Sequence, residues 1–343
     1  MSSQPLISTP PPSPTLRKSL KTIFTNSRTN VLLIFVPLGH IAFGLKWSNT
    51  WVFVLNFLAI IPLAMLFEFA AENDSLKVGR FYSDFLNATL SNTVESIVFI
   101  AALIEGQIRV VQASILGSII SNILLVLGMK FFAGGFYHKV QTFNMTAAQM
   151  CSSLMVLACI SLIIPAAFIS FVYSVENSDI INNDDKKYKE ISNLSYGTAI
   201  ILLIIYILYL LFQLKTHQQL YQDEWVIEDD EQPQLDLRVS LSLLAVVIFF
   251  VAFSAEHLAD SIEGIVESHE LNKTFVGLIL IPNIKKISEI ICILTSMKKE
   301  EGLDFAIRNA VDSSIDGESN WLKGAMFLAT YVIIAIATYF YPN

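Results

Sequence analysis

Long apolar stretches recur along this 343-residue chain, and they constrain its fold more than any other feature. Hydrophobic residues make up 54% of the sequence and charged residues only 15%, a balance that a soluble protein of this length would find hard to bury in one core. Most stretches approach the roughly 20 residues that a helix needs to cross a bilayer. We therefore predict an all-α, polytopic membrane protein. The predicted spans are 31–45, 50–71, 85–104, 110–133, 146–173, 196–214, 239–258, 274–297 and 322–341.

The N-terminal tail, residues 1–29, is rich in Ser and Pro and carries several basic residues just before the first span. It lacks the short apolar core and small-residue cleavage site of a signal peptide, so we expect a disordered cytosolic tail. With the N-terminus in the cytosol, most Lys and Arg residues outside the spans lie on the cytosolic side, as the positive-inside rule requires.

Between the sixth and seventh predicted spans, residues 215–238 form a strongly acidic loop that would also be cytosolic. The loop separates a first group of spans, 30–214, from a second group, 239–343. Two interpretations remain open: a solvated linker between two halves, or a surface that concentrates divalent cations. The net charge of −8 gives no reason to expect a nucleic acid as a partner.

Glu95 and Glu289 lie inside predicted spans, in two segments that look like copies of one another. An ionisable group within a span is costly, and by default it indicates a cation or proton site that faces the protein interior. Five predicted spans separate the corresponding elements of the two halves. Because five is odd, the copies must enter the bilayer from opposite sides, and inverted repeats of this kind place a substrate site near the midplane.

In the first copy, oxygen-bearing side chains accompany the glutamate. Ser91, Asn92 and Glu95 are spaced so that one side of a helix could present all three, and Asn87 extends the polar stretch. Carboxylate, amide and hydroxyl oxygens suit Ca²⁺, which accepts several such ligands in flexible geometry. An ionisable carboxylate can also exchange its ion for a proton.

The next span contains small and polar residues at helical spacing: Ser114, Ser118, Ser121 and Asn122. One interpretation is a small-residue seam for close helix packing. The other adds ion lining to packing, because Gln112 and Asn122 exceed what packing needs. Both could hold at once.

Several segments resemble the vacuolar cation/proton exchangers of the calcium/cation antiporter superfamily. They are 87–95, 106–128, 142–149, 254–264, 274–282 and 316–324, and the resemblance covers nearly the whole chain after about residue 19. It implies a fold of eleven helices, the first peripheral and the others forming two inverted five-helix repeats. It also implies a carrier rather than an enzyme, with no cofactor beyond the transported Ca²⁺ and H⁺.

The same resemblance implies roles for individual residues. Glu95 would be the cation ligand and proton carrier of the first repeat, and Asn92 its amide neighbour. Gln112 and Ser118 would support the site from the next helix, and Glu289 would be the cation ligand of the second repeat.

The second repeat departs from the family motif Pro-Ile-Val-Gly-Asn-Ala-Ala-Glu-His. Here the segment reads Pro282-Asn-Ile-Lys-Lys-Ile-Ser-Glu-Ile290, so Lys285 and Lys286 replace the expected Gly and Asn. Because Lys286 precedes Glu289 by three residues, we predict an i, i+3 ion pair on one helix. The ammonium would then stand in the place of Ca²⁺, which makes both lysines inhibitory substitutions.

A second departure follows Ile315, which runs directly into Asp316 where the family has the rest of one helix and another whole helix. The second repeat is therefore predicted to be truncated, with about nine spans instead of eleven. Two functions follow as hypotheses. The first is a proton-coupled antiporter of the vacuolar membrane that moves cytosolic Ca²⁺ into the vacuole. The alternative is a transport-inactive, truncated paralogue that acts as a membrane partner or is a non-functional product.

Overall fold

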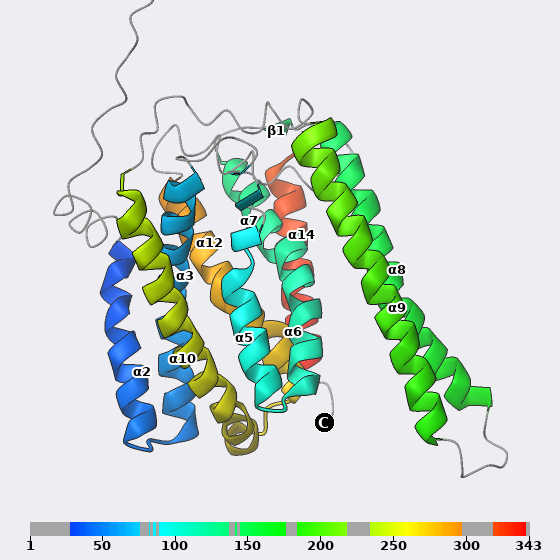
Figure 1. Ribbon diagram of the computed structural model, residues 1–343, viewed down its shortest axis with the longest axis horizontal. Helices are drawn as coiled ribbons and strands as arrows, with labels where there is room; N and C mark the ends of the chain where they lie inside the picture. The colour runs from blue at the N-terminus through cyan, green and yellow to red at the C-terminus, as the bar shows by residue number, and fades with distance from the viewer. Residues whose placement is uncertain are drawn as a thin grey trace, which may run out of the picture. The chain divides into compact units, whose positions relative to one another are not determined.

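The computed structural model describes residues 28–75, 82, 85–86, 89–136, 141–142, 145–175, 184–217, 234–296 and 318–340, most of them helical (Figure 1). The α-helices are α2 (Phe35–Gly44), α3 (Asn49–Ser75), α5 (Thr93–Ile104), α6 (Ile108–Ile120), α7 (Leu127–Gly134), α8 (Met145–Val175), α9 (Asp184–Leu211), α10 (Leu237–His269), α11 (Lys273–Phe275), α12 (Ile281–Ser296) and α14 (Trp321–Tyr339). A 3₁₀ turn, η1 (Arg28–Ile34), precedes α2, and π-helical turns extend or join others: η2 (Ser121–Val126), η3 (Phe212–Thr216) and η5 (Val276–Leu280).

Every predicted span overlaps a helix, which confirms the all-α fold class. Five helical segments of the described chain are long and apolar enough to cross a membrane: Asn49–Ser75, Ile108–Gly134, Ser192–Thr216, Leu237–His269 and Trp321–Tyr339. Shorter apolar helices cover Asn30–Gly44, Thr93–Ile104 and Gln149–Pro165.

The predicted span over 85–104 is interrupted by a turn, and residues 85, 86, 89 and 90 before the turn are helical. Ser91 and Asn92 form a turn, and α5 begins only at Thr93. Asn92 has φ −101° and ψ 6°, outside the helical region. Ser and Asn side chains compete with helical backbone hydrogen bonds, which explains the break at this polar pair.

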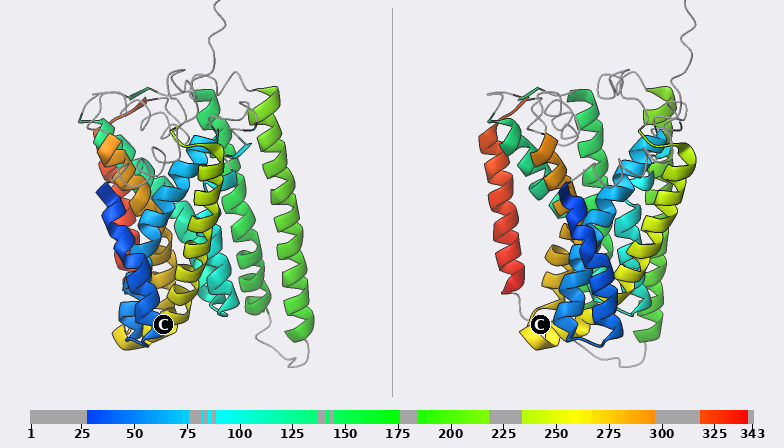
Figure 2. Two further views of the ribbon diagram at one scale, coloured as in Figure 1. Left: turned by 60° about the vertical axis from the view of Figure 1, so that its left-hand side comes forward. Right: turned by 90° about the vertical axis from the view of Figure 1, so that its left-hand side faces the viewer.

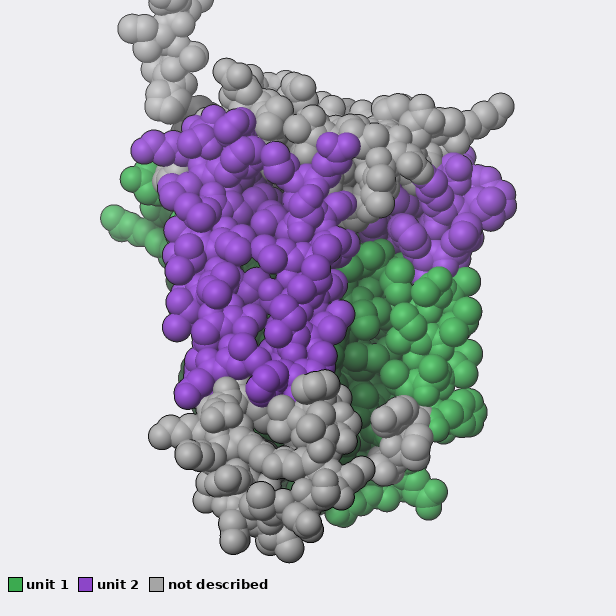
Figure 3. Space-filling view, turned by 90° about the vertical axis from the view of Figure 1, so that its right-hand side faces the viewer, with its two compact units in different colours: residues 1–126, 228–292, 329–343 green, residues 127–227, 293–328 purple. Residues whose placement is uncertain are grey.

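The chain divides into two compact units that interleave along the sequence (Figure 3). The first unit contains residues 1–126, 228–292 and 329–343, and the second contains 127–227 and 293–328. The predicted division at an acidic loop remains a prediction, because residues 218–233 lie outside the described part, as do residues 1–27 of the predicted tail.

The core of the first unit lies between α3 and α10, which run side by side in every view (Figure 2). Ile60 and Phe67 of α3 and Leu258 of α10 are almost completely buried. Polar contacts join the C-terminal end of α3 to the N-terminal end of α10: the Asn73 side chain accepts a 2.9 Å hydrogen bond from the Leu235 backbone N–H, and the Ser240 hydroxyl donates to the Ala70 carbonyl at 2.9 Å. Lipid offers no such partners, so these bonds favour this pairing of helices.

Two glycines let α6 approach η5 closely. A Cβ added at Gly117 would collide with the Leu278 backbone, and one added at Gly277 would lie 2.6 Å from the Val110 carbonyl oxygen. Small residues permit such close helix contact in membranes. The close contact lies on α6, where Ser114, Ser118 and Ser121 of the predicted seam are buried and Asn122 is exposed, and it brings α6 to the segment that continues into α12.

In the second unit, α8 packs against α9 (Figure 1). The short strands β1 (Gln141–Thr142) and β2 (Glu318–Ser319) pair antiparallel, with Gln141 opposite Ser319. Of the 18 most apolar consecutive residues in the span over Ser192–Thr216, only 6% are buried within the protein. This helix therefore presents nearly all of its surface outward, as a lipid-facing helix would.

Candidate ion-binding site

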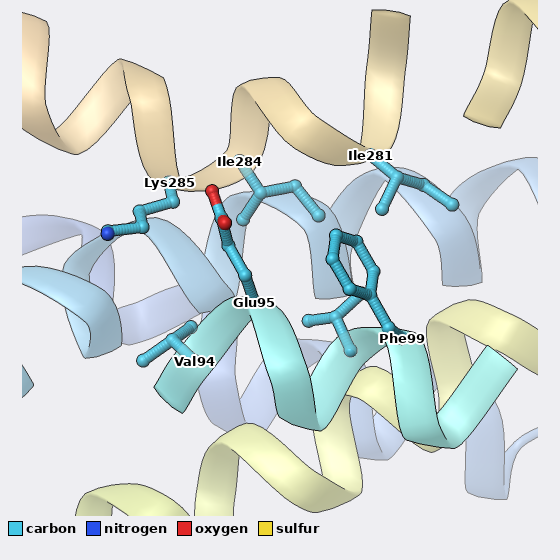
Figure 4. A pocket seen from close by; sticks show the side chains of 7 residues that line it. Val94, Glu95, Phe99, Ile281, Ile284 and Lys285 are labelled. Atoms are coloured by element: carbon cyan, nitrogen blue, oxygen red, sulfur yellow. The ribbon is translucent and has the colours of Figure 1, made fainter. Parts of the chain in front are cut away.

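Glu95 lies in the first turn of α5, where the polar turn at Ser91 and Asn92 ends and the apolar helix begins. Its side chain is buried, and the Ser118 hydroxyl of α6 donates a hydrogen bond to Glu95 Oε2 at 3.0 Å. Figure 4 shows the carboxylate pointing from α5 toward α12. The recess around it is lined mostly by apolar side chains: Val94, Val98, Phe99, Ile281 and Ile284, together with Lys285. A carboxyl group in such surroundings needs either a proton or, when it is ionised, a cationic partner.

Lys286 of α12 supplies that partner. Its Nζ lies 3.0 Å from Glu95 Oε1 and 3.3 Å from Glu289 Oε1, and it donates a hydrogen bond to the latter. Only 1% of Lys286 is exposed. One ammonium thus bridges two carboxylates that are far apart in the sequence.

Lys285 adds a second ammonium at the same place. Its Nζ lies 3.3 Å from Glu289 Oε1, one helical turn away, and the lysine is buried. Glu68 of α3 lies close enough to Lys285, Lys286 and Glu289 to interact electrostatically with all three. We call Glu68, Glu95, Lys285, Lys286 and Glu289 the charge cluster.

The predicted pair between Lys286 and Glu289 is confirmed, but the contact between Lys286 and Glu95 could not be read from the sequence. The two residues belong to different helices, and spacing along one helix says nothing about such a contact. The only hint is indirect: a buried lysine needs carboxylate partners.

The other predicted site residues lie at varying distances from the cluster. Ser118 contacts it directly, whereas the Ser114 hydroxyl donates to the Val110 carbonyl of its own helix. The side chains of Ser91, Asn92, Gln112 and Asn122 are exposed, and Asn87 lies outside the described residues. Their roles as ligands or supports remain predictions. No group of three His, Cys, Asp or Glu side chains suited to a metal ion occurs in the part of the chain that the structure describes.

Sequence reasoning also missed a polar network that joins three helical segments. Tyr331 of α14 donates its hydroxyl proton to Asn283 Oδ1 of α12 at 3.0 Å. The hydroxyl of Ser121, at the start of η2, lies 3.1 Å from the Tyr331 oxygen. A buried Tyr hydroxyl usually finds a partner, so Tyr331 in an apolar span was the available signal. The network holds α14 next to the segment that carries the charge cluster.

Solved structures share this fold. The structure of native YfkE matches with a TM-score of 0.69 and 25% identity, covering 91% of this chain and 100% of that one. The structure of the H⁺/Ca²⁺ exchanger CAX matches with a TM-score of 0.61 over 92% of this chain and 88% of that one. At 11% identity, the second match shows the fold alone.

Several relatives are similar over most of their length. The vacuolar calcium ion transporter of Schizosaccharomyces pombe is 36% identical, covering 94% of this chain and 87% of the relative. The Ca²⁺/H⁺ antiporter of Synechocystis is 32% identical, covering 91% and 97%. Vacuolar cation/proton exchanger 5 of Arabidopsis thaliana is 32% identical, covering 97% and 77%.

The sodium/calcium exchanger protein model matches residues 48–215 and 239–315. Its second match ends at Ile315, where the sequence predicts the loss of two helices. The comparison with the Schizosaccharomyces pombe protein runs over 370 positions, more than the 343 residues of this chain, so that relative contains residues that this chain lacks. With most of its length matched and the fold shared, the chain belongs to the sodium/calcium exchanger family.

Proposed function

We propose that this protein is a proton-coupled Ca²⁺ antiporter of the vacuolar membrane, which moves cytosolic Ca²⁺ into the vacuole in exchange for H⁺. Its family supports this proposal, as do the relatives named vacuolar calcium ion transporter and Ca²⁺/H⁺ antiporter. One structural observation carries it: Glu95 and Glu289 converge on a single cationic group, Lys286 Nζ. Two carboxylates that reach one ammonium define a position where a transported cation could sit.

The site can couple Ca²⁺ to protons through these carboxylates. Ca²⁺ binds carboxylate and hydroxyl oxygens, so Glu95, Glu289 and Ser118 would contribute ligands once the lysines move away. Asn92 and Gln112 would join if the exposed turn and helix face turn toward the ion. Protonation removes the negative charge that holds Ca²⁺, so an acidic compartment would favour its release.

Transport can be tested with purified protein in liposomes that have an acidic interior. We expect ⁴⁵Ca²⁺ uptake that collapses when a protonophore removes the proton gradient. Glu95→Gln should reduce the uptake to background, because an amide carries no charge and exchanges no proton. Glu105→Gln is the matched control, since Glu105 lies at the other end of α5 and is exposed. Uptake by Glu95→Gln equal to that of the control would refute the proposed role of Glu95.

We also propose a cytosolic N-terminus, on the distribution of Lys and Arg in the sequence. An epitope placed before residue 28 should be accessible to antibody on intact vacuoles. Accessibility only after the vacuoles are permeabilised would reverse the orientation.

A transport-inactive relative is the second candidate function. The observation that motivates it is the presence of two lysines in the charge cluster. In the liposome assay this candidate predicts no proton-dependent uptake by the unchanged chain. A membrane partner role would then show as altered Ca²⁺ uptake by a full-length relative when the two proteins are reconstituted together.

A further inference from the structure

We infer that Lys286 is a built-in counter-cation that determines specificity: its ammonium occupies the cation position between Glu95 and Glu289 and opposes Ca²⁺ binding until it is displaced. The inference deepens the proposed function and rests on it for the identity of the site. It concerns which ions this chain's own residues admit to that site.

Lys286 contacts both carboxylates through one atom. Its Nζ lies 3.0 Å from Glu95 Oε1 and 3.3 Å from Glu289 Oε1. Because only 1% of the residue is exposed, water cannot replace these partners. A buried ammonium without a carboxylate is strongly unfavourable. Separating Lys286 from these carboxylates would therefore cost considerable free energy.

The remaining groups leave little room for a second cation. Ser118 holds the other Glu95 oxygen, Oε2, while Lys285 lies 3.3 Å from the same Glu289 oxygen that Lys286 contacts. Two ammonium groups therefore face Glu95 and Glu289, and Glu68 is a third carboxyl group close enough to interact with both lysines. A Ca²⁺ ion entering this place would add two positive charges within a few ångströms of both lysines, and repulsion at such distances is large where water is scarce.

The arrangement follows from helix geometry. Lys285 and Lys286 precede Glu289 by four and three residues, so both lysines lie on the helix face that carries the glutamate. Of these two lysines, Lys286 also reaches α5, where its Nζ forms an ion pair with Glu95. Its replacement should therefore change the cation site more than replacement of a lysine elsewhere.

The test compares Ca²⁺ binding by the full-length chain and by lysine variants in detergent. Lys286→Met removes the charge at similar side-chain length, and Lys286→Asn provides a smaller polar replacement. Lys273→Met is the control, because Lys273 forms an ion pair of 2.9 Å with Glu263 in which both side chains are substantially exposed. Binding is measured by equilibrium dialysis with ⁴⁵Ca²⁺ and by the rise in unfolding temperature with added Ca²⁺.

We expect Lys286→Met to bind Ca²⁺ at a concentration at least about ten-fold lower than the unchanged chain, because a like charge has been removed next to the ion. Lys273→Met should match the unchanged chain. Equal Ca²⁺ affinity in the unchanged chain and in both Lys286 variants would overturn the inference. Folded variants that bind no Ca²⁺ would overturn it as well. Failure of both Lys286 variants to fold would also count against it, because it would assign the lysine to the fold rather than to ion selection.

Uptake assays separate this inference from the proposed function. Tight Ca²⁺ binding by Lys286→Met would support the inference. If neither the unchanged chain nor this variant showed proton-driven uptake, antiport would be refuted. Proton-driven uptake by the unchanged chain at the same Ca²⁺ affinity as Lys286→Met would support antiport and overturn the inference.

Discussion

The regions around Glu95 and Glu289 both place a carboxylate in an apolar helical segment, but they surround it differently. Near Glu95, the partner within its own half of the chain is neutral: the hydroxyl of Ser118. Near Glu289, two ammonium groups lie on the same helix, and both approach within 3.3 Å of one carboxylate oxygen. The first region depends on a cation from elsewhere, whereas the second carries its own.

This difference shows how one altered repeat can change the other. Lys286 belongs to α12, yet it also contacts the carboxylate of α5. The substitution in the second repeat therefore alters the charge balance of a first repeat whose own motif resembles the family. The charges of both halves meet at one place, so a change in one repeat alters the surroundings of the carboxylate in the other.

Separation of the two regions should have the largest effect. In Gly117→Val, the added side chain would collide with the Leu278 backbone, so α6 and η5 would have to move apart. We expect a loss of about 4 kcal/mol or more of folding free energy, measured as a fall in folded yield and unfolding temperature. Gly197→Val in α9 is the control, because no atom lies within 4 Å of a Cβ added there. Equal behaviour of the two variants would show that the close crossing is not required.

Removal of either carboxylate tests the asymmetry directly. Glu289→Gln removes both ion pairs of 3.3 Å and leaves buried Lys285 without its glutamate, so we expect a loss of about 3 kcal/mol or more. Glu95→Gln leaves Lys286 its contact with Glu289, so we expect a smaller loss, about 1–3 kcal/mol. Unfolding of both variants in detergent measures the difference. A larger loss for Glu95→Gln would reverse the comparison.

Loss of the neutral partner should cost less. Ser118→Ala removes the hydroxyl that donates to Glu95 Oε2, and we expect about 1 kcal/mol of destabilisation. Ser114→Ala is the matched control on the same helix, since the hydroxyl of this buried side chain donates to the Val110 carbonyl of its own helix. The two variants should therefore differ in unfolding temperature, with Ser118→Ala the less stable.

An exposed ion pair should matter least. Lys273→Met removes a pair of 2.9 Å at the helix surface, but exposed pairs contribute only about 0–1 kcal/mol because water and salt screen them. We expect little change in unfolding temperature. A loss as large as that of Glu289→Gln would contradict the idea that burial gives the charge cluster its importance.

The sequence predicted the helices well because their signals are local. Apolar length and composition placed each predicted span on a stretch that is at least partly helical, and the intrahelical pair of Lys286 and Glu289 followed from a separation of three residues. The interruption before α5 could not be predicted, because a polar pair such as Ser91 and Asn92 can continue a helix or end it. The side-chain oxygens of Ser91, Asn92 and Glu95 were expected on one side of a helix. Glu95 is buried, whereas Ser91 and Asn92 are exposed.

By itself, the sequence determined the all-α class, the family resemblance, the two glutamates within predicted spans and the altered motif around Lys285 and Lys286. Each depends on residue type and spacing along the chain, and local geometry translates these into helices and faces. Only the tertiary structure decided that Lys286 contacts Glu95, that Ser118 rather than Gln112 meets that carboxylate, and that Tyr331 contacts Asn283. These contacts depend on how closely separate helices cross and in which direction their side chains point, and packing of the whole chain fixes both.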